Sequence, residues 1–220
     1  MLEIRHLKKY YGDLCVYEDF SLSAEDGKTL AVLGASGAGK TTLLNIAAGL
    51  LPFDGGEIFG RPERVSYVFQ SDRLVRHMTV LENLRLVADG ARAKEYLVRA
   101  KLSEFADQYP ARLSAGMSRR VAILRAFLYD APLVLMDEPF RNLDLTLKYE
   151  LMNFYKKLQE TEKRTGIFVT HDVKEAAYLA DRVLVLEKGA AALDLAVKDR
   201  REAEEILSKY FLEKVNAKTE

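Results

Sequence analysis

The sequence predicts an α/β fold with a mostly parallel sheet, flanking helices, an N-terminal antiparallel β part and an inserted α-helical subdomain. Three observations predict it. An apolar run at 29–33 is followed by a glycine-rich loop and then by a helical pattern that ends at Gly49. Apolar runs at 133–136 and 166–169 are followed by polar residues, as expected where buried parallel strands end. The segment 79–110 has helical spacing and no convincing strand.

The N-terminal part has β character. Residues 2–11 alternate weakly and run into a turn at 12–13, and residues 17–23 form a second strand before a turn at 26–27. Tyr11 lies at the first turn, upstream of the glycine-rich loop. A tyrosine at such a place either packs at the surface or in the core, or offers a platform on which an adenine ring stacks.

Residues 34–41 (Gly-Ala-Ser-Gly-Ala-Gly-Lys-Thr) fit the phosphate-binding pattern G-x-x-x-x-G-K-[ST]. Glycines let backbone N–H groups approach phosphate oxygens, and the following helix N-terminus adds partial positive charge. We expect Lys40 to reach the β- and γ-phosphates of a nucleotide and the Thr41 hydroxyl to hold Mg²⁺. The alternative is a glycine-rich turn that matches by chance, which the flanking strand and helix disfavour. The predicted nucleotide-binding residues of this loop are Gly34, Ser36, Gly37, Ala38, Gly39, Lys40, Thr41 and Thr42.

Two further strands are expected before the helical segment, at 57–59 and 64–70. The second ends on Gln70. Open α/β sheets bind ligands at the carboxyl ends of their strands, so Gln70 matters only if this end faces the nucleotide. Otherwise it is an unremarkable polar residue at a strand end.

Helices are expected at 80–88 and 93–105, where apolar residues recur every three or four positions. Ser114 is a suitable N-cap for a third helix that ends near Tyr129. The first turn of this helix, with Ala115-Gly116, has exposed N–H groups that suit a second phosphate contact.

The run at 133–138 ends on two carboxylates, Asp137 and Glu138. We expect Asp137 to coordinate Mg²⁺, directly or through water, and Glu138 to polarise an attacking water as a general base. The alternative is a strand capped by solvated acids. A phosphate loop in the same domain favours the functional interpretation.

The rest of the chain alternates helices and strands. The strand at 166–170 ends at His171, which is either structural or placed to reach a γ-phosphate. The other expected elements are a helix at 145–162, a short helix at 173–180, a strand at 182–186, an edge strand at 191–195, a terminal helix at 199–215 and a tail at 216–220.

Composition excludes several classes of protein. Lys+Arg and Asp+Glu both number 33, so the net charge of zero gives no bulk electrostatic reason to bind nucleic acid or an anionic membrane. Cys15 is the only cysteine, which excludes an internal disulfide and suits a reducing cytosol. The N-terminus has no signal pattern, and no apolar run approaches the roughly 20 residues that span a bilayer. We expect a soluble protein that reaches a membrane through partners.

The order of these motifs resembles that of the ATP-binding cassette (ABC) ATPase family over nearly the whole chain. Residues 34–41 resemble its Walker A motif and 133–137 its Walker B motif. Residues 113–117 (Leu-Ser-Ala-Gly-Met) resemble its signature motif, and 142–144 (Asn-Leu-Asp) its D-loop. Three single positions complete the resemblance, namely the adenine-stacking aromatic at Tyr11, the Q-loop glutamine at Gln70 and the switch histidine at His171.

The resemblance implies a P-loop NTPase fold in a single domain over 1–220. A RecA-like core with an antiparallel β part would comprise 1–70 and 131–220, and a helical subdomain with the signature motif would comprise 71–130. The implied cofactors are ATP and Mg²⁺. The implied catalytic residues are Glu138, His171 and Gln70; the metal ligands are Thr41, Gln70 and Asp137; and the nucleotide contacts outside the phosphate loop are Tyr11, Ser114, Gly116 and Asp144.

The resemblance also implies partners. Two cassettes of this family dimerise head to tail around two ATP molecules, so Ser114 and Gly116 would complete a site on a second, identical ATPase subunit. The helical subdomain would receive a coupling helix of a membrane permease, which places the chain at the cytoplasmic face of the cell membrane. A solute-binding protein would take part indirectly, and no nucleic acid is expected.

Finer features resemble importer cassettes of the nitrate, sulfonate and taurine type, which are also close to thiamine-precursor importers. They are Met117 and the runs at 80–83, 137–140 and 169–172. The expected function is ATP hydrolysis that powers uptake of a small solute through a separate permease. One alternative is an exporter or a lipid- or lipoprotein-extraction ATPase. Another is a regulatory module that binds nucleotide without hydrolysis, which the presence of Glu138 and His171 disfavours. A DNA-repair or translation factor is disfavoured because such proteins usually carry two cassettes or a long coiled coil.

The chain departs from the family pattern at three residues. Ala115 replaces the first signature glycine, Arg119 stands where the family often has Gln, and Arg141 is unusual beside the D-loop. The segment between Gln70 and Ser114 is also shorter than typical. We therefore expect the isolated chain to be a slow ATPase that needs its permease.

Overall fold

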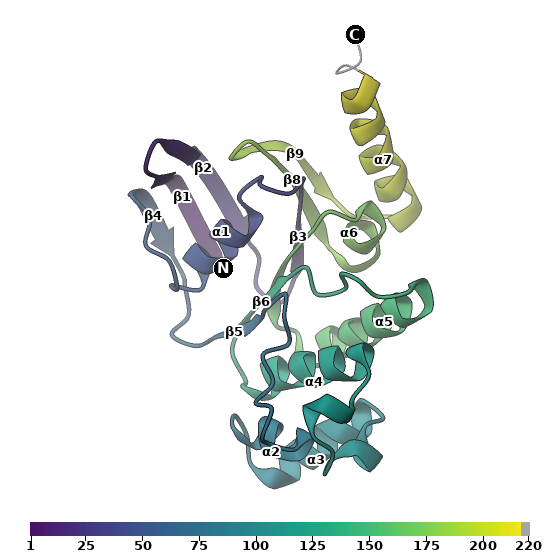
Figure 1. The fold of residues 1–220 in the computed structure, drawn as a ribbon. Helices are drawn as coiled ribbons and strands as arrows, with labels where there is room; N and C mark the ends of the chain where they lie inside the picture. The colour runs from purple at the N-terminus through teal and green to yellow at the C-terminus, as the bar shows by residue number, and fades with distance from the viewer. Residues whose placement is uncertain (217–220) are drawn as a thin grey trace. The chain divides into compact units, whose positions relative to one another are not determined.

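The computed structural model divides the chain into two compact units (Figure 1). One unit comprises residues 1–61 and 165–220, and the other comprises 62–164. The structure describes residues 1–216. The predicted tail therefore lies outside the described residues, except for Asn216, which ends the last helix.

The first unit contains the predicted antiparallel part. Strands β1 (Leu2–Tyr11), β2 (Leu14–Ala24) and β4 (Gly55–Phe59) form a three-stranded sheet in the order β2-β1-β4. Leu2, Ile4 and Leu7 of β1 are buried. A bulge between Ile4 and Leu7, with a positive φ of 52° at His6, keeps these side chains on one covered face.

The same unit holds parallel strands β3 (Thr29–Leu33), β7 (Thr165–Thr170) and β8 (Arg182–Glu187), followed by the antiparallel edge strand β9 (Ala190–Ala196). Their order is β7-β3-β8-β9. All five residues of β3 are buried, as its continuous apolar run predicts. Leu33 pairs with Thr170 on one side and Val185 on the other. The segments that follow β3, β7 and β8 therefore begin at one edge of the sheet.

Three helices belong to this unit: α1 (Lys40–Ala47), α6 (Val173–Leu179) and α7 (Arg200–Asn216). Helix α6 contacts β3 and lies beside α7 in Figure 1. Asp172 caps α6 by accepting hydrogen bonds from the backbone N–H groups of Lys174 and Glu175.

The second unit consists of a parallel pair, β5 (Val65–Val68) and β6 (Leu133–Asp137), and four helices. The helices are α2 (Val80–Arg85), α3 (Gly90–Arg99), α4 (Ala115–Leu128) and α5 (Leu145–Glu162). Short 3-10 turns occupy 103–105 and 110–112. Helices α4 and α5 pack through apolar side chains, with the rings of Phe127 and Tyr155 5.9 Å apart.

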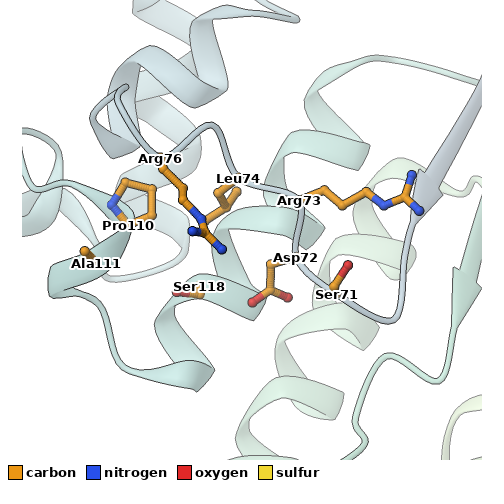
Figure 2. A pocket seen from close by; sticks show the side chains of 8 residues that line it. All are labelled: Ser71, Asp72, Arg73, Leu74, Arg76, Pro110, Ala111 and Ser118. Atoms are coloured by element: carbon orange, nitrogen blue, oxygen red, sulfur yellow. The ribbon is translucent and has the colours of Figure 1, made fainter.

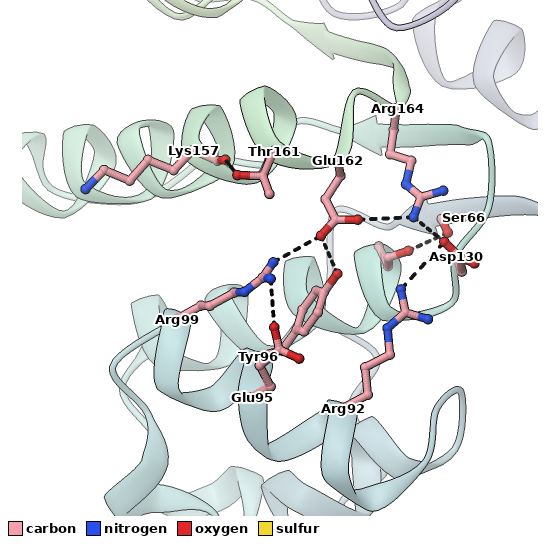
Figure 3. A network of polar contacts seen from close by, with 11 residues as sticks. Ser66, Arg92, Glu95, Tyr96, Arg99, Asp130, Lys157, Thr161, Glu162 and Arg164 are labelled. Carbon is pink, nitrogen blue, oxygen red and sulfur yellow. Dashed lines mark hydrogen bonds and ion pairs between the residues drawn. The ribbon is translucent and has the colours of Figure 1, made fainter.

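A polar network joins α3 to the end of α5 (Figure 3). The Glu162 carboxylate accepts hydrogen bonds from the Tyr96 hydroxyl at 2.5 Å and from Arg99 at 3.1 Å. Arg164 donates to its other oxygen at 3.2 Å and also pairs with Asp130. The network ties three separate segments of this unit together.

Some predicted boundaries were wrong. The helix expected at 93–105 runs from 90 to 99, because the Asp89 side chain caps an earlier start and Lys101 has a positive φ of 55°. The helix expected at 80–88 ends at Arg85. Strand β5 ends at Val68, so Gln70 lies two residues beyond the strand rather than at its end.

Candidate functional site

The phosphate loop connects β3 to α1 in the first unit. Lys40 is buried, and its ammonium donates hydrogen bonds to the backbone carbonyls of Gly34 and Ala35, each at 2.8 Å. The loop is thus wrapped around its own lysine. Ala35, Ser36 and Gly37 at its tip are exposed, so an anion can reach this turn.

Two glycines of the loop have a structural requirement. A Cβ atom on Gly34 would lie 2.5 Å from the carbonyl oxygen of Leu186, which no side chain tolerates. Gly39 precedes α1 with a φ of 99°, a conformation that L-residues rarely adopt. A Cβ atom there would also lie 2.8 Å from the Tyr17 hydroxyl.

Tyr17 is a positioning residue that the sequence did not indicate. It lies on β2, is fully buried, and donates its hydroxyl to the Gly39 carbonyl at 2.9 Å. Burial raises the pKa of Tyr17, so the phenol stays neutral and remains a donor. Gly39 lies 22 residues further along the chain, and the sequence around Tyr17 indicates only a half-buried strand. No local pattern could therefore have revealed the hydrogen bond from Tyr17 to Gly39.

A cavity of about 460 Å³ flanks the loop. Residues 35–38 form one part of its lining, and residues 186–188 form another. Phe211 and Lys214 of α7 complete it, and Lys214 is held by an ion pair with Glu187 at 2.6 Å. The outer side of the loop is therefore open, and its walls include lysines.

His171 follows β7 at the edge where the loop follows β3. The Gly34 N–H donates to the Thr170 carbonyl at 3.2 Å, so the predicted switch histidine is attached directly beside the start of the loop. His171 is exposed, as is Thr41 in the first turn of α1. Tyr11 lies at the end of β1, exposed, with the Lys9 ammonium 5.3 Å from its ring centre.

The other predicted site residues lie in the second unit, at the ends of β5 and β6. Val68 pairs with Met136, so Gln70 and Glu138 both follow strands that end at one edge. Asp137 and Glu138 are buried, with exposed fractions of 6% and 8%. This matches the predicted arrangement of an apolar strand that delivers two carboxylates.

Glu138 has a further partner that the sequence did not suggest. Its backbone has a positive φ of 44°, and its Oε2 atom lies 3.1 Å from the guanidinium of Arg141. Arg141 is 44% exposed on its side chain. The guanidinium therefore occupies one side of the carboxylate that is expected to face the attacking water.

Ser114 and Asp144 each cap a helix. The Ser114 hydroxyl accepts a hydrogen bond from the Met117 N–H at 3.2 Å at the start of α4. Asp144 accepts from the Leu147 N–H at 3.0 Å at the start of α5. Gly116 is buried under the Leu147 side chain, so the beginnings of the two helices are packed together.

A cavity of about 530 Å³ opens beside α4 in the same unit (Figure 2). Its lining contains both charges, a proline and small polar groups. The lining residues are Ser71, Asp72, Arg73, Leu74, Arg76, Pro110, Ala111 and Ser118.

The oxygen donors of the predicted metal ligands suit Mg²⁺, which prefers carboxylate, hydroxyl and amide oxygens. Within residues 1–216, however, no group of three or more His, Cys, Asp or Glu side chains is arranged to hold a metal ion. In the same part of the chain, no helix combines the length and apolar content that crossing a membrane requires.

Comparison with known proteins gives consistent results. The ABC transporter family profile matches residues 17–141. The chain is 39% identical over 211 residues to the sulfate/thiosulfate import ATP-binding protein CysA of Escherichia coli (strain K12) and 38% identical to that of Photorhabdus laumondii. Each alignment covers 86% of this chain but only 58% of the relative, so the chain spans little more than half the length of these proteins.

Solved structures of the ATP-binding cassette MJ0796 have the same fold. A dimeric structure of this bacterial ABC transporter cassette matches with a TM-score of 0.80 and 29% identity. A dimeric post-hydrolysis state bound to ADP and Pi matches with a TM-score of 0.79 and 28% identity. Both matches cover 90% of this chain and all of the other chain. The predicted α/β fold with an antiparallel β part and helical parts is confirmed.

Proposed function

Because this chain belongs to the ABC transporter family, we propose that it is the ATP-hydrolysing subunit of an importer for a small solute. The observation that carries the proposal is the phosphate loop. It is folded around the buried Lys40 ammonium, with an exposed tip and with His171 attached beside its first residue. This arrangement suits a triphosphate whose terminal phosphate lies near the histidine.

Each site residue has a proposed role. Lys40 and the loop N–H groups bind the β- and γ-phosphates, and Tyr11 stacks on adenine. Thr41 in the first unit, and Gln70 and Asp137 in the second, are the residues proposed to offer oxygen ligands to Mg²⁺. The carboxylate Glu138 takes a proton from the attacking water. The proposed mechanism needs no covalent intermediate, because positioning and charge stabilisation carry most of phosphoryl transfer.

Ser114, Gly116 and Asp144 are proposed to act across a head-to-tail dimer of two identical chains. Ser114 is exposed at the N-terminus of α4, where partial positive charge favours a phosphate. The dimeric MJ0796 cassettes support this proposal by their similarity. Each nucleotide-binding site would then be completed by the signature residues of the second chain.

A membrane permease is the proposed third component. The cavity of Figure 2 is proposed to receive a coupling helix of the permease, which would hold the chain at the cytoplasmic face of the membrane. The solute is proposed to be a small anion. The import function named for the CysA relatives supports uptake rather than export, and sulfate or thiosulfate joins nitrate, sulfonate and taurine as the candidate class.

The experiment that tests this function is ATP-dependent dimerisation of the Glu138→Gln variant. Removing the general base should slow hydrolysis by about 100-fold or more while ATP still binds. We expect a dimer on size-exclusion chromatography only with Mg·ATP, and a monomer with ADP or without nucleotide. Glu150→Gln, an exposed change on α5, is the matched control and should behave as the wild type.

Two outcomes would contradict parts of the proposal. A chain that binds ATP without hydrolysing it in single-turnover assays would be a regulatory module instead. A Glu138→Gln chain that binds ATP and stays monomeric, even with Ala115→Gly added, would refute the proposed dimer site at Ser114.

A further inference from the structure

The side chain of Arg119 in α4 is almost completely buried against the segment that follows β5. Its guanidinium donates hydrogen bonds to the Phe69 carbonyl at 2.7 Å and to the Gln70 carbonyl at 2.5 Å. Its Nε atom lies 3.0 Å from Oδ1 of Asp72, in an ion pair rather than a directed hydrogen bond. All three guanidinium nitrogens of Arg119 therefore face the segment 69–72, which contains Gln70.

These hydrogen bonds replace the ones that a neighbouring strand would make if β5 continued beyond Val68. Strand β5 ends at Val68, so the carbonyls of Phe69 and Gln70 have left the sheet and need other donors. Arg125, further along α4, supplies the next ones, donating to the carbonyls of Asp72 and Arg73 at 3.2 and 3.0 Å. The whole segment 69–73 is thus fixed to α4 rather than to the sheet.

The charge of Arg119 also has a specific partner. Only 9% of its side chain and 24% of the Asp72 side chain are exposed. A buried charge is costly unless it is paired and hydrogen-bonded, so each residue requires the other. A glutamine at 119 would have one amide group and no charge, and would leave Asp72 with the charge of Arg125 alone. The presence of arginine rather than glutamine at position 119 is therefore explained by its ion pair with Asp72.

We propose that Arg119 is a positioning residue that holds Gln70 in place for Mg²⁺ and the attacking water. This inference rests on the proposed ATPase function. The guanidinium acts on Gln70 through the backbone carbonyl of that residue. Because the same helix begins at Ser114, Arg119 also links the signature residues to Gln70 through one rigid element.

The cavity of Figure 2 lies beside the residues that connect the signature motif to Gln70. Asp72, the ionic partner of Arg119, lines the cavity together with Ser118, the residue before Arg119. An occupant of the cavity would contact Asp72 itself and Ser118, the chain neighbour of Arg119. A molecule bound in the cavity would therefore change the position of Gln70 through its contact with Asp72, two residues further along the chain.

The test compares Arg119→Met with a matched control, Arg120→Met, in the full chain. Arg120 is the next residue of α4 and loses the same charge, but it bonds to the Ala100 carbonyl at 3.1 Å and lies 3.4 Å from Glu150, away from segment 69–73. Single-turnover hydrolysis with protein in excess gives the rate constant and the Mg²⁺ concentration for half-maximal rate. ATP binding in EDTA gives the affinity without metal.

We expect Arg119→Met to lower the rate constant about ten-fold and to raise the Mg²⁺ requirement about ten-fold, the usual effect of losing an outer-shell partner. ATP affinity in EDTA should stay within about two-fold, since Gln70 acts through the metal. Arg120→Met should leave all three values within about two-fold. If Arg119→Met does not fold, Arg119→Lys carries the test, because an ammonium keeps the charge and loses the fork that reaches both carbonyls.

The outcomes separate the two proposals. An Mg²⁺ requirement unchanged in a folded Arg119 variant of an active chain overturns the positioning role and leaves the ATPase function standing. Equal effects of the Arg119 and Arg120 changes also overturn it, because they indicate general destabilisation. A wild-type chain that shows no hydrolysis in the same assay overturns the proposed function, and the positioning role falls with it.

Discussion

The Glu162 network of Figure 3 allows a quantitative prediction for the Glu162→Gln variant. The side chain of Glu162 is 13% exposed and accepts three hydrogen bonds, from Tyr96, Arg99 and Arg164. A glutamine keeps one carbonyl acceptor but presents N–H groups to at least one arginine. Hydrogen bonds to a charged group contribute about 1.5–3 kcal/mol, and two of the three donors come from partly exposed arginines. We therefore expect the free energy of unfolding to fall by about 2–3 kcal/mol.

The assay is urea unfolding followed by far-UV circular dichroism, with Glu160→Gln as the control. Glu160 lies on the same helix, is 64% exposed, and has only a distant pairing with Lys156 at 3.9 Å. The same substitution there should change stability by no more than about 0.5 kcal/mol. Equal losses from the two variants would refute the importance of the network.

The pH dependence of this loss has a definite sign. Burial alone raises the pKa of Glu162, but the hydrogen bonds from Tyr96 and Arg99 and the charge of Arg164 outweigh it, so the pKa is lowered. A lowered carboxyl pKa stabilises the fold above the unfolded value of about 4.3 and loses this contribution as pH falls through the folded value. The difference between wild type and Glu162→Gln should therefore shrink between pH 7 and pH 3.5. A loss of constant size over this range would contradict the charge argument.

Three further predictions concern the candidate site. Lys40→Met removes the ammonium proposed to bind phosphates, so ATP affinity by titration calorimetry should fall about ten-fold or more, and unchanged affinity would exclude that role. Arg141→Gln removes the guanidinium that pairs with Glu138 at 3.1 Å and competes with water for its carboxylate. A partly exposed pair is worth up to about 1 kcal/mol, so single-turnover hydrolysis should rise up to about five-fold, whereas a slower rate would show that Arg141 assists catalysis. Ala115→Gly restores the family residue and should strengthen ATP-dependent dimerisation of Glu138→Gln in sedimentation experiments; no change would show that the methyl group does not obstruct the signature site.

Elements specified by local signals were predictable to the residue. The helix at 145–162 matches α5, because Asp144 caps its start and Lys163, with a positive φ of 48°, ends it. The strand at 2–11 matches β1, where buried residues alternate on either side of a bulge between Ile4 and Leu7. The strand–loop–helix at 29–47 and the carboxylates after β6 also follow from local pattern.

The supports of the candidate site could not be predicted, because they join residues far apart in the chain. Tyr17 bonds to Gly39 across 22 positions, and Arg119 bonds to Phe69 and Gln70 across about 50. Periodicity shows only that Tyr17 lies on a strand and Arg119 on a helix. The identity of a hydrogen-bond partner depends on the packed fold, and so does the end of β5 at Val68, where Arg119 replaces a strand neighbour as the donor.

Helix α4 is the element on which these supports converge. Its first turn presents Ser114 and Gly116, its second turn holds Gln70 through Arg119, and its last turns hold the Asp72 and Arg73 carbonyls through Arg125. Buried, hydrogen-bonded charges resist separation, because breaking one such pair costs about 3–5 kcal/mol. A shift of α4 therefore moves the signature residues and Gln70 together rather than one after the other. If the proposed dimer forms at Ser114, its effect reaches Gln70, the proposed metal ligand, through α4. An occupant of the cavity beside Asp72 would act on Gln70 through the same helix.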